Sequence, residues 1–214
     1  MTGSSETTLA SSANSGPSCA WRPHGSDPGV IVIAGTGSIA YGRNSAGRTA
    51  RAGGWGFAIS DEGSGHWIGR SAVAAAMGVY DKGQTTPFLK ITMKSWRVET
   101  PEQLILPANA SPPPDFAGLF PAVLSAADAG DSCARTILDE AGSELANLAG
   151  IVIARLFAVD DATPVAMSGG VFGNSVVVRQ AFYNSLRAKH PRVAIDETIV
   201  DPVQGALALA RKPG

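Results

Sequence analysis

The segment VIVIAGTGS (residues 30–38) is the strongest indication of the fold in this 214-residue chain. Its first five residues, VIVIA, form an unbroken apolar run rich in β-branched side chains, which predicts a strand buried on both faces. The next four, GTGS, place glycines and hydroxyls directly at the end of that strand. Glycine lets backbone N–H groups face an anion without a Cβ in the way, so GTGS predicts a phosphate-binding turn. A short strand over residues 39–42 and a turn over residues 44–47 follow, which indicates a hairpin.

Two more glycine-rich segments carry candidate binding residues. In residues 53–65 (GGWGFAISDEGSG), the Trp55 indole could contact a sugar ring and the Asp61 carboxylate could accept from its hydroxyls. The alternative is that Trp55 packs in the core while Asp61 and Glu62 cap the following helix. In residues 168–175 (SGGVFGNS), the glycines would let a purine or ribose lie against the backbone, and the alternative is an ordinary strand-to-helix turn.

The rest of the chain alternates helices with short strands. Helices are predicted over residues 66–77, from Asp115 to about residue 129, from Asp131 to residue 156, from Asn174 to Pro191, and from Asp201 onward. Strands are predicted over residues 164–167 and 193–196. Residues 80–114 give no clear element and end in Ser-Pro-Pro-Pro, which predicts an extended connection. Strands that alternate with helices and end in glycine turns indicate an α/β fold.

The composition excludes several classes of protein. The length of 214 residues suits one or at most two domains, and the apolar content of 44% is enough for a hydrophobic core. Charged residues make up 16% of the chain, and the net charge is −1. This balance leaves no basic surface for nucleic acid or for an anionic membrane. Cys19 and Cys133 are too few for a disulfide framework and lack metal-site spacing, which indicates the cytoplasm. No apolar run could span a membrane, and residues 1–20 lack the regions of a signal peptide, so residues 1–27 are predicted to be a disordered or unrelated tail.

Other enzyme motifs are excluded by their context. Gly35, Gly37 and Ala40 match the dinucleotide-binding pattern G-x-G-x-x-A, but that pattern needs a helix where a hairpin is predicted here. The three histidines lack metal-ligand spacing, and no serine lies in a G-x-S-x-G elbow. Metalloprotease and serine hydrolase functions are therefore not expected.

Taken in order, the GTGS turn, the segment GGWGFAISDEGSGHWIG (residues 53–69) and the segment SGGVFGNS resemble the BadF/BadG/BcrA/BcrD ATPase family. Within it, the likeness is greatest to the N-acetylglucosamine kinases of the actin, hexokinase and Hsp70 superfamily, and it covers about residues 28–211. The resemblance implies a ribonuclease H-like domain with a mixed sheet flanked by helices. Members of the family bind ATP and sugar between two such domains, and this chain matches the C-terminal one.

The resemblance also implies roles for individual residues. It implies an amino-sugar kinase that transfers a phosphoryl group from ATP, with Mg²⁺, to a sugar hydroxyl. The residues expected at ATP are Gly35, Thr36, Gly37, Ser38, Ala117, Gly169, Gly170 and Asn174. The residues expected at the sugar are Gly54, Trp55, Gly56 and Asp61. No catalytic residue and no metal ligand are expected within this chain.

The chain departs from the family pattern in two places. The phosphate loop DxGGTxT is absent, and the nearest string, DKGQT (residues 81–85), lacks the second glycine and is interpreted as a surface loop. The family's catalytic aspartate lies upstream of GTGS, where residues 1–26 contain no aspartate and Asp27 stands too close to the strand. We therefore expect residues 28–214 to be a C-terminal domain without its phosphate-loop partner, inactive alone, and covered by that partner or by a second copy of the chain.

Two other functions compete with the kinase. A non-catalytic regulatory protein that binds sugar or nucleotide is favoured by the missing motifs. An activator of 2-hydroxyacyl-CoA dehydratases would need interface cysteines for an iron–sulfur cluster, and neither cysteine lies near the glycine segments. The second competitor is therefore disfavoured.

Overall fold

The computed structural model describes residues 27–200, and the predicted helix from Asp201 and all but the last residue of the predicted tail over residues 1–27 lie outside this range. Five strands form one mixed sheet in the order β3-β2-β1-β4-β5. Their bounds are β1 Gly29–Ala34, β2 Ser38–Arg43, β3 Thr49–Gly53, β4 Pro164–Ser168 and β5 Ala194–Val200. β2 pairs antiparallel with both β1 and β3, whereas β4 pairs parallel with both β1 and β5. The predicted α/β fold with a mixed sheet flanked by helices is confirmed.

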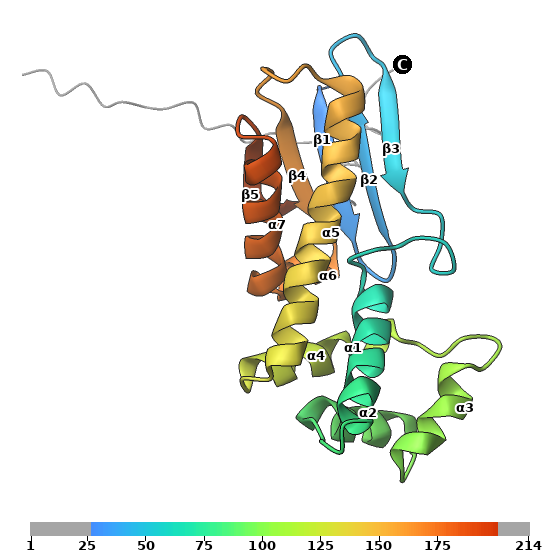
Figure 1. Cartoon of the computed structure of the whole chain (residues 1–214). Helices are drawn as coiled ribbons and strands as arrows, with labels where there is room; N and C mark the ends of the chain where they lie inside the picture. Colours follow the sequence, from blue (N-terminus) through green and yellow to red (C-terminus); the bar gives the residue numbers. More distant parts are fainter. Residues whose placement is uncertain (1–26, 201–214) are drawn as a thin grey trace, which may run out of the picture.

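Two long helices cover one face of the sheet (Figure 1). They are α5 Ser132–Leu156 and α7 Val176–Lys189, which pack against each other, and α5 also packs against β1, β2 and β3. The predicted apolar stripe of α5 is confirmed, because Ala141, Leu145, Ala149 and Val152 are all 0% exposed. The approach is so close that a Cβ on Gly42 of β2 would lie 2.6 Å from Cγ1 of Val152.

The remaining helices gather beyond one end of the sheet in Figure 1. They are α1 Gly65–Tyr80, α2 Pro87–Trp96, α3 Ile105–Ala108 and α4 Phe120–Asp128, together with the short 3₁₀ helices η1 Pro101–Leu104 and η2 Ala117–Leu119. A single-turn helix, α6 Gly170–Asn174, directly precedes α7. No helix within residues 27–200 is long and apolar enough to cross a membrane.

The helix starts correct several sequence-based predictions. The N-cap of α1 is Ser64, whose side chain accepts from the Trp67 backbone N–H, so the predicted cap by Asp61 and Glu62 is wrong. Asn174 does not cap the helix that ends near Pro191, because Ser175 caps α7 and Asn174 is the last residue of α6. In both places a serine one or two residues further along the chain has the extended backbone that an N-cap requires.

Two other boundaries also differ from the predictions. Asp115 accepts a hydrogen bond from the Gly118 N–H at 2.9 Å and so stabilises the turn of η2, while α4 begins only at Phe120. Residues 80–114, for which no clear element was predicted, contain helices α2 and α3, whereas the predicted extended connection at residues 111–114 has neither helix nor strand. Thr86 at the N-cap followed by Pro87 was the available signal for α2. The string at residues 81–85 is exposed and lacks helix or strand, as predicted for a surface loop.

Candidate functional site

The three glycine segments leave the sheet at the same end. β1 and β3 both run antiparallel to β2, and β4 runs parallel to β1, so all three strands point the same way. The chain after Ala34, after Gly53 and after Ser168 therefore emerges along one edge. β4 is the direct neighbour of β1, whereas β3 lies two strands away, about 10 Å at the usual strand spacing.

The GTGS turn is held by the first turn of α1. The Gly65 N–H donates to the Gly35 carbonyl at 2.8 Å, and the His66 N–H donates to the Thr36 carbonyl at 3.2 Å. These bonds use two of the N–H groups that a helix start leaves unpaired. Among the described residues, none accepts a hydrogen bond from the N–H groups of Thr36 or Gly37. An anion at this turn would therefore meet the turn's own N–H groups.

Asp61 joins the second glycine segment to the GTGS turn. Its Oδ1 accepts from the Ser38 N–H at 3.3 Å, and a Cβ on Gly37 would lie only 2.9 Å from its Oδ2. The carboxylate is 8% exposed, and the residue has a φ of 72°, a left-handed conformation that aspartate tolerates better than most residues. The Ser38 hydroxyl donates to the Glu62 carbonyl at 2.7 Å. The sequence does not predict that Asp61 packs against the turn, because no local pattern indicates a left-handed backbone conformation at an aspartate.

The third glycine segment lies directly against the end of β1. Gly169 has a φ of 99°, and a Cβ there would lie 2.3 Å from the Ala34 carbonyl oxygen, so only glycine fits. Gly170 begins α6, and the Asn174 side-chain amide donates back to the Gly170 carbonyl at 2.7 Å, which closes that single turn. The SGG and GTGS turns are therefore adjacent.

Ala117, the first residue of η2, also lies close to the GTGS turn. A Cβ on Gly65 would lie 3.1 Å from the Gly35 carbonyl oxygen and 3.5 Å from the Ala117 Cβ. Gly65 thus separates the GTGS turn from Ala117 by one small residue. The structure brings together the expected ATP residues around the ends of β1 and β4, which the sequence order alone did not show.

Trp55 is a surface residue. Its side chain is 60% exposed, so the alternative of a core tryptophan is wrong. The Arg51 guanidinium lies over the indole with its carbon 3.8 Å from the ring centroid, a cation–π contact. Gly54 and Gly56 on either side have φ values of 69° and 89°, which let the chain turn sharply around the indole.

The same segment presents further apolar side chains to solvent. Phe57 is 53% exposed and Ile59 is 78% exposed. Large exposed apolar side chains in one short segment are typical of a surface that another protein surface covers. That a second domain or a second copy covers this segment stays a prediction.

The sequence does not predict His66 as a site residue, because the histidines lack metal-ligand spacing and no other local pattern marks it. Its ring centroid lies 5.0 Å from that of Phe57 and 5.2 Å from that of Phe116, which precedes Ala117. Burial between these rings lowers the pKa of His66, and the nearby Arg70 lowers it further, against the opposite effects of Asp61 and Asp115. A neutral imidazole thus links the second glycine segment, η2 and the GTGS turn.

The described residues form no metal-binding cluster of their own. Within residues 27–200, no three His, Cys, Asp or Glu side chains are placed to hold a metal ion. Asp61 is the acidic side chain packed against the GTGS turn, and it already accepts from Ser38. The site is therefore built mainly from backbone groups, one carboxylate and aromatic rings.

Comparison with known proteins shows the family of this chain. The sequence model of the BadF/BadG/BcrA/BcrD ATPase family matches residues 7–210. The chain belongs to this family. A member from Clostridium acetobutylicum, named N-acetylmuramic acid/N-acetylglucosamine kinase, is 37% identical over 186 residues, which are 86% of this chain and 61% of the relative. The N-acetyl-D-glucosamine kinase of Dictyostelium discoideum is 29% identical over 187 residues, 85% of this chain and 59% of the relative.

Two solved structures resemble this chain in fold. The crystal structure of a putative N-acetylglucosamine kinase from Chromobacterium violaceum matches with a TM-score of 0.65 and 30% identity, over 88% of this chain and 61% of that one. A putative N-acetylglucosamine kinase from Porphyromonas gingivalis matches with a TM-score of 0.64 at 17% identity, over 86% of this chain and 60% of that one, which is a likeness of fold alone. The chain spans about 60% of the length of these relatives.

Proposed function

We propose that this member of the BadF/BadG/BcrA/BcrD family forms one wall of an ATP and amino-sugar site in an N-acetylglucosamine kinase. The intact kinase would transfer the γ-phosphoryl group of ATP to a sugar hydroxyl. The observation that carries the proposal is the convergence of three glycine segments at one end of the sheet, with Gly169 pressed against Ala34. The names of the relatives, both N-acetylglucosamine kinases, support this choice of substrate class.

The nucleotide would lie along the ends of β1 and β4. A phosphate oxygen would accept from the free N–H groups of Thr36 and Gly37, and the open space beside Gly35, where a Cβ would meet no atom within 4 Å, would admit it. The adenosine would lie along Gly170, Asn174 and Ala117. A Mg²⁺ ion bound to the phosphates would neutralise charge that develops during transfer.

The sugar would lie at the second glycine segment. The exposed Trp55 indole offers an apolar face for a sugar ring, and the Asp61 carboxylate accepts hydrogen bonds. Because Asp61 also accepts from Ser38 at the GTGS turn, this carboxylate would place a sugar hydroxyl close to the phosphates. Such placement is the main way in which enzymes accelerate phosphoryl transfer.

One wall of this kind does not contain all the parts of a kinase. The family's phosphate loop and its catalytic aspartate do not occur in the sequence of residues 1–214. Loss of a general base alone lowers rates about 10²- to 10⁴-fold. We expect the purified chain to bind ligands without phosphorylating them. The regulatory alternative also predicts this result, and reading the nucleotide sequence immediately upstream for an apolar strand followed by DxGGTxT distinguishes the two.

Isothermal titration of the purified chain tests the proposal. We expect N-acetylglucosamine and a non-hydrolysable ATP analogue each to bind, the sugar more weakly to Trp55→Ala and the nucleotide more weakly to Gly35→Ala, whose Cβ would occupy the space proposed for the phosphate. The matched control is Gly78→Ala, where an added Cβ meets no atom within 4 Å. Absence of binding of both ligands would contradict the proposal. Phosphorylation of the sugar well above background in a coupled assay would show that the chain needs no second wall.

A further inference from the structure

A cavity of about 220 Å³ lies at the end of the sheet where β4 and β5 begin. It is lined by the last turn of α5, by residues 157–163, which connect α5 to β4, and by residues 189–193 between α7 and β5. A single water needs about 10–15 Å³, so this cavity has room for a small organic molecule. None of the residues expected at ATP or at the sugar lines it, because the three glycine segments leave the sheet at the opposite end.

Thr163 lines this cavity and has a hydroxyl without a partner. The residue is 1% exposed, and its Oγ1 forms no hydrogen bond with any residue that the structure describes. Its backbone carbonyl, by contrast, accepts from the Ala194 N–H at 2.9 Å. A buried hydroxyl without a partner is unfavourable, so a ligand that bonds to it gains affinity at this position.

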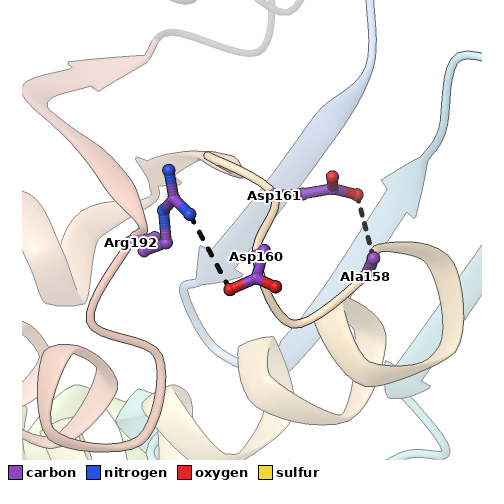
Figure 2. A network of polar contacts seen from close by, with 4 residues as sticks. All are labelled: Ala158, Asp160, Asp161 and Arg192. Atoms are coloured by element: carbon purple, nitrogen blue, oxygen red, sulfur yellow. Dashed lines mark hydrogen bonds and ion pairs between the residues drawn. The ribbon is translucent and has the colours of Figure 1, made fainter.

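The side chains around the cavity carry both signs of charge. Lys189 and Arg192 are positive, whereas Asp161 is negative. Lys189 donates to the neutral Asn147 side chain at 2.6 Å. Arg192 faces Asp160 at 3.7 Å, in an exposed pair that water screens (Figure 2). Both cations therefore retain charge and N–H groups that suit a phosphate.

A bare anion does not match the whole cavity. The helices α5 and α7 both end here, and helix C-termini carry partial negative charge that adds to the charge of Asp161. A ligand that also donates hydrogen bonds fits better, because Asp161 accepts from the Ala158 N–H and has further acceptor capacity. The His190 imidazole also lines the cavity and can bond to hydroxyls. Apolar side chains, among them Ile153 and Phe157, complete the wall and suit the carbon face of a ring.

We propose that this cavity binds a monosaccharide phosphate, at a second site separate from the glycine segments. The phosphate would accept from Lys189 and Arg192. The sugar hydroxyls would bond to Asp161 and Thr163, and the ring would lie against Phe157. The inference does not rest on the proposed function, because the two sites share no residue. Such a site would make the protein responsive to sugar phosphates, the product class of the proposed kinase.

The test compares a whole ligand with its two parts by isothermal titration. The probes are glucose 6-phosphate, glucose and inorganic phosphate, and the proteins are the full chain, Arg192→Gln, Thr163→Val and Arg187→Gln. Arg187 is the matched control for Arg192. It is also exposed and its substitution also removes one charge, but it lies in the last turn of α7 over the Tyr183 ring and does not line the cavity.

We expect glucose 6-phosphate to bind the full chain at least about 10-fold more tightly than glucose or inorganic phosphate, because only the whole ligand uses both the cations and the acceptors. Arg192→Gln and Thr163→Val should each weaken its binding about 3- to 10-fold. Arg187→Gln should change it less than about twofold. Thr163→Val should keep or raise the urea midpoint, because valine has nearly the same shape and removes an unpartnered hydroxyl. Weaker binding by this variant would then not result from a weaker fold.

Three results would overturn the inference. The first is no binding of glucose 6-phosphate, or equally tight binding of inorganic phosphate. The second is equal loss of binding in Arg192→Gln and in Arg187→Gln, which would show an effect of net charge alone. The third is displacement of glucose 6-phosphate by excess N-acetylglucosamine, because the ligand would then lie at the glycine segments. The proposed function is judged separately, by binding of N-acetylglucosamine and nucleotide, which none of these variants should change.

Discussion

The two ends of the sheet hold their loops by different means. At the end where β1, β3 and β4 stop, the GTGS and SGG turns are held by close backbone contacts and by the buried Asp61 carboxylate. Examples of the backbone contacts are the hydrogen bond from the Gly65 N–H to the Gly35 carbonyl and the close approach of Gly169 to Ala34. At the other end, Figure 2 shows a connection held by charged side chains. Asp161 accepts from the Ala158 N–H at 2.8 Å, and Asp160 faces Arg192 at 3.7 Å.

This contrast indicates which loops are suited to binding a ligand through their backbone groups. Backbone contacts between glycines tolerate little change and leave peptide N–H groups aimed at the space where a ligand would lie. Exposed side chains such as Asp160, at 93% exposure, can move without disturbing the strands. We therefore expect substitutions at the glycine end of the sheet to lower the free energy of unfolding much more than substitutions at the charged end.

Gly169→Ala should have the largest effect. The substitution places a Cβ 2.3 Å from the Ala34 carbonyl oxygen at a φ of 99°, so both strain and a backbone clash follow. We expect a loss of about 3–5 kcal/mol in the free energy of unfolding, measured by urea denaturation.

The matched control for this change is Gly173→Ala in α6. A Cβ there meets no atom within 4 Å, and alanine is favoured over glycine in a helix, so stability should stay equal or rise by up to about 1 kcal/mol. Equal losses in the two variants would show that the junction of β1 with the SGG turn is not tight.

Asp61→Ala should cost less, about 1–2 kcal/mol of the same free energy. It leaves the buried Ser38 N–H without its acceptor and forces alanine into a left-handed backbone at φ 72°. Asp61→Asn keeps an acceptor oxygen and a residue that tolerates this backbone, so its loss should be under about 1 kcal/mol. If both variants lose the same stability in urea, the hydrogen bond to Ser38 is not what Asp61 contributes.

The sequence predicted the strands and the long helix better than the site. The apolar run 30–34 and the stripe of α5 are strong periodic signals, and both elements form as expected. The predicted N-caps lie two to three residues from the observed cap of α1 and one residue from that of α7, because serine, aspartate and asparagine all compete for such positions.

The arrangement of the site depends on contacts that no local pattern encodes. Strand direction brings three distant segments to one edge, and the left-handed backbone of Asp61 turns its carboxylate toward Ser38. The stacking of Arg51 on Trp55 pairs a strand residue with a loop residue four positions later, which alternation alone does not predict. The position of His66 likewise depends on ring contacts with Phe57 and Phe116, which lie 9 and 50 residues away in the sequence.

His66 predicts a pH dependence of stability. Because burial lowers its pKa below the usual 6.5, the folded state favours the neutral ring. The stability that this preference contributes is present above pH 6.5 and is lost as the pH falls through the folded-state pKa. His66→Phe keeps a ring between Phe57 and Phe116 but removes the proton site. The variant should lose less stability than the parent between pH 6.5 and 5, and parallel urea midpoints over that range would contradict this.

Asp160→Asn should have the smallest effect, under about 0.5 kcal/mol in the free energy of unfolding. Asp160 and Arg192 are 93% and 62% exposed, so water and salt screen their attraction and both side chains lose freedom when they pair. The variant should therefore match the parent protein in urea denaturation at low and at high salt, and it should bind nucleotide and sugar unchanged. A loss above 1 kcal/mol at low salt would show that the charged end is also a rigid part of the fold, and the contrast between the two ends would then fail.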